Sequence, residues 1–197
     1  VATELGACTT TAPPSGNLGD ILAWTGQVSN ALETGHYGYL NRMLQTITNG
    51  SYSAVKRAGT EANTSDQGLY WCTNLVIDSY NLAGKQGLNL NHQAVVSMHI
   101  WWKSASGYIF LDYLGLNKQN VLSSITPGYA MFFESVPETH TGNEHVALVK
   151  SIRIDANGNG SIETYDSNTT RKTHVYPVAN WDVKNVIFTL VGFGGVR

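Results

Sequence analysis

The amino-acid sequence predicts an α+β fold, with helices in the first half of the chain and an antiparallel sheet in the second. Up to Lys103 the apolar residues recur every three to four positions, which is typical of helices with one buried face. From Tyr129 onward they alternate with a period of two, and Asn157-Gly158 is a strong signal for a hairpin turn between two strands. Helices followed by an antiparallel meander define this fold class.

The helical pattern covers four segments, residues 18–34, 39–47, 69–83 and 92–103. Asn17 is available to cap the first helix, and Gly84 stops the third, which is apolar enough to be buried. The strand pattern covers five segments, residues 129–134, 145–154, 160–166, 174–178 and 186–192. Residues 1–17 have no period and are interpreted as a flexible tail or linker. Residues 18–58 are expected to form a helical N-terminal extension, and residues 59–197 the main domain.

The composition favours an extracellular or cell-surface protein. Charged residues make up 13% of the chain, against about 25% in an average protein, and Asn, Thr, Ser and Gly fill the surface instead. The formal net charge of −2 gives no electrostatic reason to expect nucleic acid as a partner. No run of about 18 apolar residues occurs, so no membrane span is expected.

No metal or cofactor is expected. Asp155, Asn157 and Asn159 alternate in a turn and superficially resemble a calcium-binding loop. The twelfth position of such a loop holds Glu, whereas this chain has Asp166 there, and strands rather than helices flank the segment. A hairpin turn is therefore the preferred interpretation of these residues.

Cys72 has the sequence context of a nucleophile. A thiol hydrolase attacks as the thiolate, which a helix N-terminus and a nearby imidazole stabilise. Cys72 lies in the first turn of the predicted helix 69–83, directly after the loop Asp66-Gln67-Gly68. The free N–H groups of that turn can also hold the oxyanion of a tetrahedral intermediate. The alternative is a disulfide with Cys8, the other cysteine of the chain, which lies in the Thr/Pro/Gly-rich tail.

Among the six histidines, His145 is the best candidate for the catalytic base. It opens the strongly alternating strand 145–154, which would hold its ring at one end of the sheet, facing a neighbouring helix. His99 lies in the middle of a helix beside tryptophans and is expected to be packed or exposed rather than catalytic. The alternative for His145 is an exposed polar residue at the start of a strand.

A third residue should orient the imidazole. In a hairpin that turns at Asn157-Gly158, residues 166–168 return to the level of His145, subject to a slip at a bulge. Asp166 and Asn168 are two residues apart and share a face of the strand. Either side chain could reach the ring, and Asp166 is preferred.

Four sequence blocks occur in a specific order, YWCTNLV at 70–76, PGYAMFF at 127–133, EHVALV at 144–149 and IETYDSN at 162–168. In this order, over roughly residues 60–193, they resemble the CHAP family. These proteins are cysteine/histidine-dependent amidohydrolases and peptidases related to the NlpC-type peptidases. The resemblance implies a papain-like core with N-terminal helices packed on a C-terminal antiparallel sheet, and it makes residues 59–197 the catalytic domain.

The resemblance also implies a function and a set of catalytic residues. The function is cleavage of amide bonds in bacterial cell-wall peptidoglycan, by an amidase or an endopeptidase that forms a thioester and needs no cofactor. By position, Cys72 is the nucleophile, His145 the base and Asp166 the orienting residue, with Asn168 its near neighbour. The family commonly has Glu where this chain has Asp166, and this shorter arm leaves the orienting role open to Asn168.

The expected substrate is the stem peptide or the glycan-peptide junction, bound by a monomeric protein that is secreted or lies at the bacterial cell surface. Five aromatic residues could form the walls of a cleft for it, with packing in the core as the alternative: Tyr70, Trp71, Trp101, Trp102 and Tyr129. Two rival functions are a catalytically silent cell-wall binding module and a thiol acyltransferase or deamidase. The segment 84–124 is longer than the family pattern predicts.

Overall fold

A computed structural model describes residues 20–34, 71–85, 87–89, 92, 94–115, 117–136, 141–166 and 173–197. The helices in these ranges are α1 (Ile21–Thr34), α4 (Trp71–Leu82), α5 (Val95–Ser104) and α6 (Lys118–Ser124). The strands are β1 (Tyr108–Asp112), β2 (Ala130–Val136), β3 (Thr141–Ile154), β4 (Gly160–Tyr165), β5 (Thr173–Ala179), β6 (Asp182–Val183) and β7 (Thr189–Val196).

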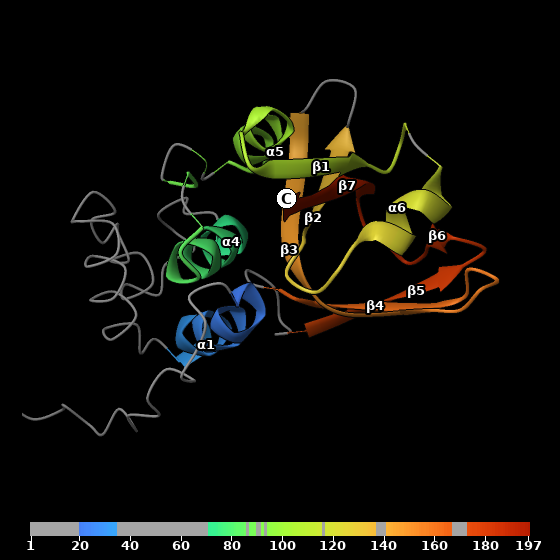
Figure 1. Ribbon diagram of the computed structural model, residues 1–197, viewed down its shortest axis with the longest axis horizontal. Coiled ribbons are helices and arrows are strands. Elements are labelled where there is room, and N and C mark those ends of the chain that lie inside the picture. The colour runs from blue at the N-terminus through green and yellow to red at the C-terminus, as the bar shows by residue number, and fades with distance from the viewer. Residues whose placement is uncertain are drawn as a thin grey trace, which may run out of the picture.

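The strands form one antiparallel sheet in the order β1-β7-β2-β3-β4-β5-β6, so β7 lies between β1 and β2. The pairing slips at three points along β2 and β3, between Phe132 and Phe133, between Glu134 and Val136, and between Val149 and Ser151. An extra residue in one strand of a pair bends that strand and increases its twist. The sheet accordingly curls into a half-barrel (Figure 1).

Both faces of β3 are buried in the middle of the strand. Val146 and Leu148 pack in a cluster with residues of α4 and α5, whereas Ala147 and Val149 pack in a second cluster with residues of α6, β5 and β7. This division follows from the period of two along a strand, which sends neighbouring side chains to opposite faces. The strand that carries His145 is therefore held by a core on each side.

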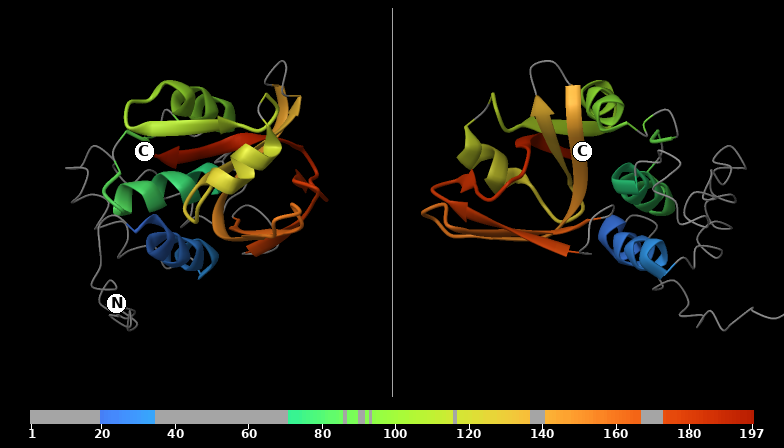
Figure 2. Two further views of the ribbon diagram at one scale, coloured as in Figure 1. Left: turned by 45° about the vertical axis from the view of Figure 1, so that its right-hand side comes forward. Right: turned by 180° about the vertical axis from the view of Figure 1, so that it is seen from behind.

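The helices lie on different sides of this sheet. α4 packs between α1 and β3, and α5 packs against β1 and β3. In Figures 1 and 2, α1 and α4 lie together on one side of β3, whereas α6 lies on the other side, next to the end of the sheet formed by β5 and β6. The hydroxyl of Tyr80 in α4 donates a hydrogen bond of 2.8 Å to the carbonyl of Gly128, which fixes α4 to the turn before β2.

The fold predicted from the sequence is wrong. The described chain is mostly a curled seven-stranded sheet, and its helices do not form a papain-like core with that sheet. One cause is the segment 104–124, which contains β1 and α6 although no element was predicted there. Because β1 pairs with the C-terminal strand β7, the sheet is not the five-stranded meander that the alternation indicated.

Several individual elements are confirmed. α4 and α5 lie within one to three residues of their predicted bounds, and all five predicted strands are present with shifted ends. α1 begins at Ile21, later than predicted, because Asp20 caps it through a 3.1 Å hydrogen bond from the Ala23 N–H, whereas the predicted cap Asn17 lies outside the described residues. The hairpin register is confirmed as well, since Ile152 pairs with Ile162 and Leu148 with Tyr165.

Other predictions lie outside the described residues: the tail 1–17, the helix 39–47 and the loop before Cys72. Within the described ranges, no helix is both long and apolar enough to cross a membrane.

Candidate active site

Cys72 is the second residue of α4, in the first turn of the helix, as predicted. Its side chain is 2% exposed and packs in the cluster that joins α4 to β3. It is a free cysteine, so it forms no disulfide with Cys8, which itself lies outside the described residues. The first-turn N–H groups of a helix have no partners within that helix, and they give its N-terminus a partial positive charge. The sulfur thus lies where a helix end favours negative charge.

His145 lies in β3, opposite Phe133 of β2. The prediction that His145 opens this strand is wrong, because β3 begins at Thr141 and its pairing with β2 includes residues before the histidine. The imidazole is stacked against the Phe133 ring, with the ring centroids 6.1 Å apart and the planes at 27°. This contact holds the plane of the imidazole, which keeps 14% of its side-chain surface exposed.

Asp166 follows directly after β4 and is 4% exposed. Its Oδ1 lies 2.8 Å from Nε2 of His145, within range of a strong hydrogen bond. Its second oxygen, Oδ2, accepts a hydrogen bond from the hydroxyl of Thr164. Because Asp166 occupies Nε2, Nδ1 is the ring nitrogen left for the thiol of Cys72.

The pKa of His145 reflects these partners. Burial lowers it, but the hydrogen bonds with Asp166 and Cys72 and the electrostatic interactions with both groups raise it by more, so that the pKa reaches about 9. The structure therefore brings together three of the four residues that the sequence proposed as catalytic. The fourth, Asn168, lies outside the described residues.

Aromatic rings surround the imidazole–carboxylate pair. Tyr176 stacks on Phe133 with centroids 5.3 Å apart, and the ring of His174 lies 4.4 Å from that of Tyr176. Burial, and then the charge of Asp166, raise the pKa of Tyr176. Apolar surroundings strengthen the electrostatic interaction between Asp166 and His145.

Sequence reasoning missed Phe133 and Thr164 as parts of this site. Both lie in predicted strands, so the signal that could have identified them is their position in the pairing of those strands. Phe133 is the cross-strand partner of His145, and Thr164 shares a face with Asp166 because the two are two residues apart.

The predicted aromatic walls of a substrate cleft are not borne out for Trp102. Its side chain is 1% exposed, and its indole N–H donates to the Gly195 carbonyl at 3.1 Å. Its ring also covers Gly194, where a Cβ would lie 2.5 Å from the indole. Trp102 is a core residue, because the glycines of β7 leave room for its ring.

Trp101 and Tyr129 also pack within the fold. Trp101 is half-buried, with its ring centroid 4.7 Å from that of Tyr108 in β1. Tyr129 is half-buried and covers Gly195, where a Cβ would lie 2.3 Å from its ring. Tyr70 and the side chain of Trp71 lie outside the part of the chain that the structure describes.

A second histidine–carboxylate pair joins α5 to β2. Nδ1 of His99 lies 2.7 Å from Oε1 of Glu134, and the two side chains are only 3% and 1% exposed. The His99 ring is packed against Phe110 and Phe132, with centroids 4.5 and 5.7 Å away. The expectation that His99 is packed rather than catalytic agrees with these contacts.

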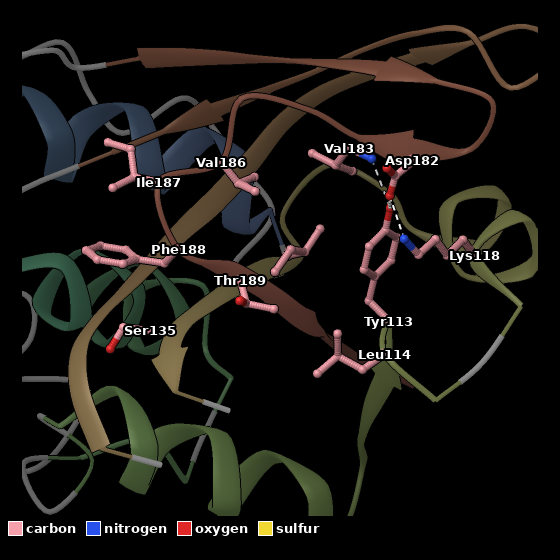
Figure 3. Close-up of a pocket in the computed structure, with 11 residues that line it drawn as sticks. Tyr113, Leu114, Lys118, Ser135, Asp182, Val183, Val186, Ile187, Phe188 and Thr189 are labelled. Carbon is pink, nitrogen blue, oxygen red and sulfur yellow. Dashed lines mark hydrogen bonds and ion pairs between the residues drawn. The ribbon is translucent and has the colours of Figure 1, made fainter. Parts of the chain in front are cut away.

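A cavity of about 410 Å³ lies elsewhere, near α6, β6 and the segment before β7 (Figure 3). Its lining residues are Tyr113, Leu114, Lys118, Ser135, Asp182, Val183, Val186, Ile187, Phe188, Thr189 and Leu190. Its polar end is an ion pair of 2.5 Å between Lys118 and Asp182, beside the hydroxyl of Tyr113. Cys72, His145 and Asp166 do not line this cavity.

Comparison with known proteins identifies no relative of this chain. No family model, no curated protein and no solved structure matches this chain. The interpretation of the site rests on its own geometry and on the order of the four sequence blocks.

Proposed function

We propose that this protein is a cysteine hydrolase that cleaves amide bonds of bacterial cell-wall peptidoglycan, as an amidase or an endopeptidase. The observation that carries the proposal is that one imidazole interacts with both groups, with Oδ1 of Asp166 2.8 Å from Nε2 of His145 and with Cys72 as its second hydrogen-bond partner. The substrate class is supported by the resemblance of the four sequence blocks to the CHAP family. A secreted or cell-surface location is part of the proposal, supported by the low charged fraction of 13%.

In the first half of the reaction, the thiol proton of Cys72 resides on His145, which gives a thiolate–imidazolium pair. Asp166 stabilises the imidazolium and holds its orientation through Nε2. The thiolate attacks the amide carbonyl carbon, and the backbone N–H groups of the first turn of α4 hold the oxyanion. His145 then gives its proton to the leaving amine as the C–N bond breaks, which leaves an acyl thioester on Cys72.

In the second half, the neutral imidazole removes a proton from a water molecule, which attacks the thioester carbonyl. The C–S bond breaks, the carboxylic acid product leaves, and the proton on His145 restores the resting pair. The pKa of His145, about 9, fits this cycle because the imidazole carries a proton at neutral pH whenever the thiolate is present.

One observation favours a second candidate, a catalytically silent module that binds the cell wall. Cys72 is 2% exposed, and buried cysteines are usually inert structural residues. On this alternative, the contacts of His145 would serve packing alone.

Digestion of purified peptidoglycan followed by mass spectrometry of the soluble products tests the proposal. The wild-type protein is expected to release fragments whose new termini identify the cleaved amide bond, and Cys72→Ala is expected to release none. Cys8→Ala is the matched control, because it also removes one thiol, and it is expected to act like the wild type. Equal digestion by Cys72→Ala would rule out the hydrolase. Tight binding without cleavage by the wild type would support the silent module.

A further inference from the structure

Thr164 is a buried hydroxyl within reach of the proposed site. It lies in β4, two residues before Asp166, so the two side chains share one face. Thr164 is 0% exposed and Asp166 is 4% exposed. Neither can exchange its protein partner for bulk water, so the hydrogen bond between them is part of the folded structure.

The hydroxyl of Thr164 has one proton and two acceptors nearby. One is Oδ2 of Asp166, and the other is the carbonyl oxygen of His174, at 3.5 Å. The carboxylate is closer and charged, so it receives the proton. Asp166 therefore has both oxygens engaged, Oδ2 by Thr164 and Oδ1 by Nε2 of His145.

This arrangement fixes the rotation of the carboxylate. The terminal torsion of an aspartate has a broad energy minimum, so a single hydrogen bond leaves the group free to turn. Two donors on the two oxygens remove that freedom. The imidazole is held in the same way, by the hydrogen bond at Nε2 and by the Phe133 ring on its face.

We propose that Thr164 is a positioning residue for the thiol. It acts through Asp166 and His145 on Cys72, and it is not expected to contact the substrate itself. The inference rests on the proposed thiol chemistry at Cys72, but it does not depend on which amide bond is cleaved. It extends the arrangement around the thiol from three residues to four.

The matched substitutions are Thr164→Val, which removes the hydroxyl and keeps the volume, and Thr164→Ser, which keeps the hydroxyl. Thr25→Val is the control elsewhere in the fold. Thr25 is also 0% exposed, but its hydroxyl donates to the Ile21 carbonyl at 2.7 Å, within α1. The control therefore shows the cost of removing a buried threonine hydroxyl whose hydrogen bond stays within α1.

Two measurements need no peptidoglycan. The first is the rate of alkylation of Cys72 by iodoacetamide at pH 7, followed on the Cys72 peptide by mass spectrometry so that Cys8 does not interfere. Thr164→Val is expected to lower this rate about tenfold, a fraction of the roughly 10²-fold cost of a 1 Å misplacement. The second is the NMR signal of the His145 Nε2–H proton, which is expected to broaden in Thr164→Val through faster exchange with water.

Thr164→Ser and Thr25→Val are expected to match the wild type within twofold in both measurements. With peptidoglycan as substrate, Thr164→Val is expected to lower kcat and leave KM unchanged.

The proposal is overturned if Thr164→Val matches Thr25→Val in alkylation and in the NMR signal. It is equally overturned if Thr164→Ser loses as much as Thr164→Val, because the methyl group and not the hydroxyl would then be responsible. A thermal melt of each variant identifies any variant that fails to fold. If Thr164→Val fails to fold, the alkylation rate and the NMR signal of Thr164→Ser decide instead. If the wild type does not digest peptidoglycan but the alkylation and NMR differences hold, the proposed function fails and the role of Thr164 stands.

Discussion

The protein contains two histidine–carboxylate pairs of nearly equal length and different surroundings. His145 lies 2.8 Å from Asp166, and His99 lies 2.7 Å from Glu134. The imidazole of His145 has a thiol as its second partner and keeps 14% of its side-chain surface exposed. The imidazole of His99 is packed between phenylalanine rings and keeps 3%.

The difference teaches that a short histidine–carboxylate distance does not by itself indicate chemistry. The two pairs differ in what else the imidazole contacts, which is the thiol of Cys72 for His145 and phenylalanine rings for His99. The His99 pair belongs to the junction of α5 with the sheet, where Glu144 of β3 also accepts a hydrogen bond of 3.1 Å from the Val96 N–H. The His145 pair instead leads to a nucleophile, so we expect activity to be lost when this pair is broken and to be kept when the His99 pair is broken.

The largest expected effect is on catalysis, at the first pair. His145→Gln removes the group that holds the thiol proton, so kcat with peptidoglycan is expected to fall on the order of 10⁴-fold or more. Asp166 then stays buried without the imidazolium, so the midpoint of thermal unfolding at neutral pH is expected to fall as well. Steady-state kinetics and a thermal melt on the same sample check both statements. Retention of a tenth of the wild-type kcat would contradict the role of His145.

The second effect is on stability, at the other pair. His99→Ala removes the imidazole from a carboxylate that stays buried, which is expected to lower the free energy of unfolding by roughly 3–5 kcal/mol. Denaturant titration measures this change. Cys72 alkylation, measured without denaturant, should stay within twofold of the wild type. The double variant His99→Leu/Glu134→Leu sharpens the test, because apolar replacement of both members is expected to recover most of the loss.

The third effect is on pH dependence. The pKa of His145 is about 9 in the folded protein and about 6.5 in an unfolded chain, so the folded state holds its proton more tightly. The stability that this provides is complete below pH 6.5 and is lost as the pH rises through 9. The difference in unfolding free energy between wild type and His145→Gln is therefore expected to shrink over that interval. A pH-independent difference would show that the ring does not titrate there.

A related measurement separates the two partners of this ring. Cys72→Ala removes the interactions of the sulfur with the ring, so the pKa of His145, followed by NMR titration, is expected to fall below about 9. An unchanged pKa would mean that Asp166 alone sets it, and the comparison between the two pairs would then lose its basis.

The smallest effect is expected at an ion pair on the same hairpin as His145. Nζ of Lys150 lies 2.7 Å from Oε1 of Glu163, with the side chains 33% and 30% exposed. Solvent screens such pairs, so Lys150→Gln is expected to change the free energy of unfolding by less than about 1 kcal/mol and to leave the activity unchanged. Denaturant titration and the digestion assay provide the baseline for the two buried pairs.

The hairpin and the site were predictable because they depend on local signals. The alternation around Asn157-Gly158 predicted the register of β3 with β4 to within the one-residue slip at Val149–Ser151, with residues 166–168 returning to the level of His145. The helix start at Cys72 followed from the apolar segment after a Gly-containing loop. Both predictions need only residues that are close in the sequence.

The arrangement of the sheet was not predictable because it depends on distant residues. β1 pairs with β7, as in Ile109 with Gly195, and no local period indicates which strand will be the partner. The glycines of β7 also weaken the strand pattern, so the prediction ended at Gly192 although the strand continues to Val196. For the same reason the sequence leaves Trp102 open between a cleft wall and core packing, since the glycines that make room for its ring are remote in sequence.

The slip between Val149 and Ser151 has a consequence for how the site is encoded. With strict pairing from the Gly158 turn, the residue facing Leu148 would be Asp166, on the opposite face from His145. The one extra residue in β3 shifts this phase, so Tyr165 faces Leu148 and Asp166 turns to the histidine. The proposed triad is thus specified by a count of residues as much as by their identity. A single deletion between Val149 and Ser151 could undo it while leaving Cys72, His145 and Asp166 all in the sequence.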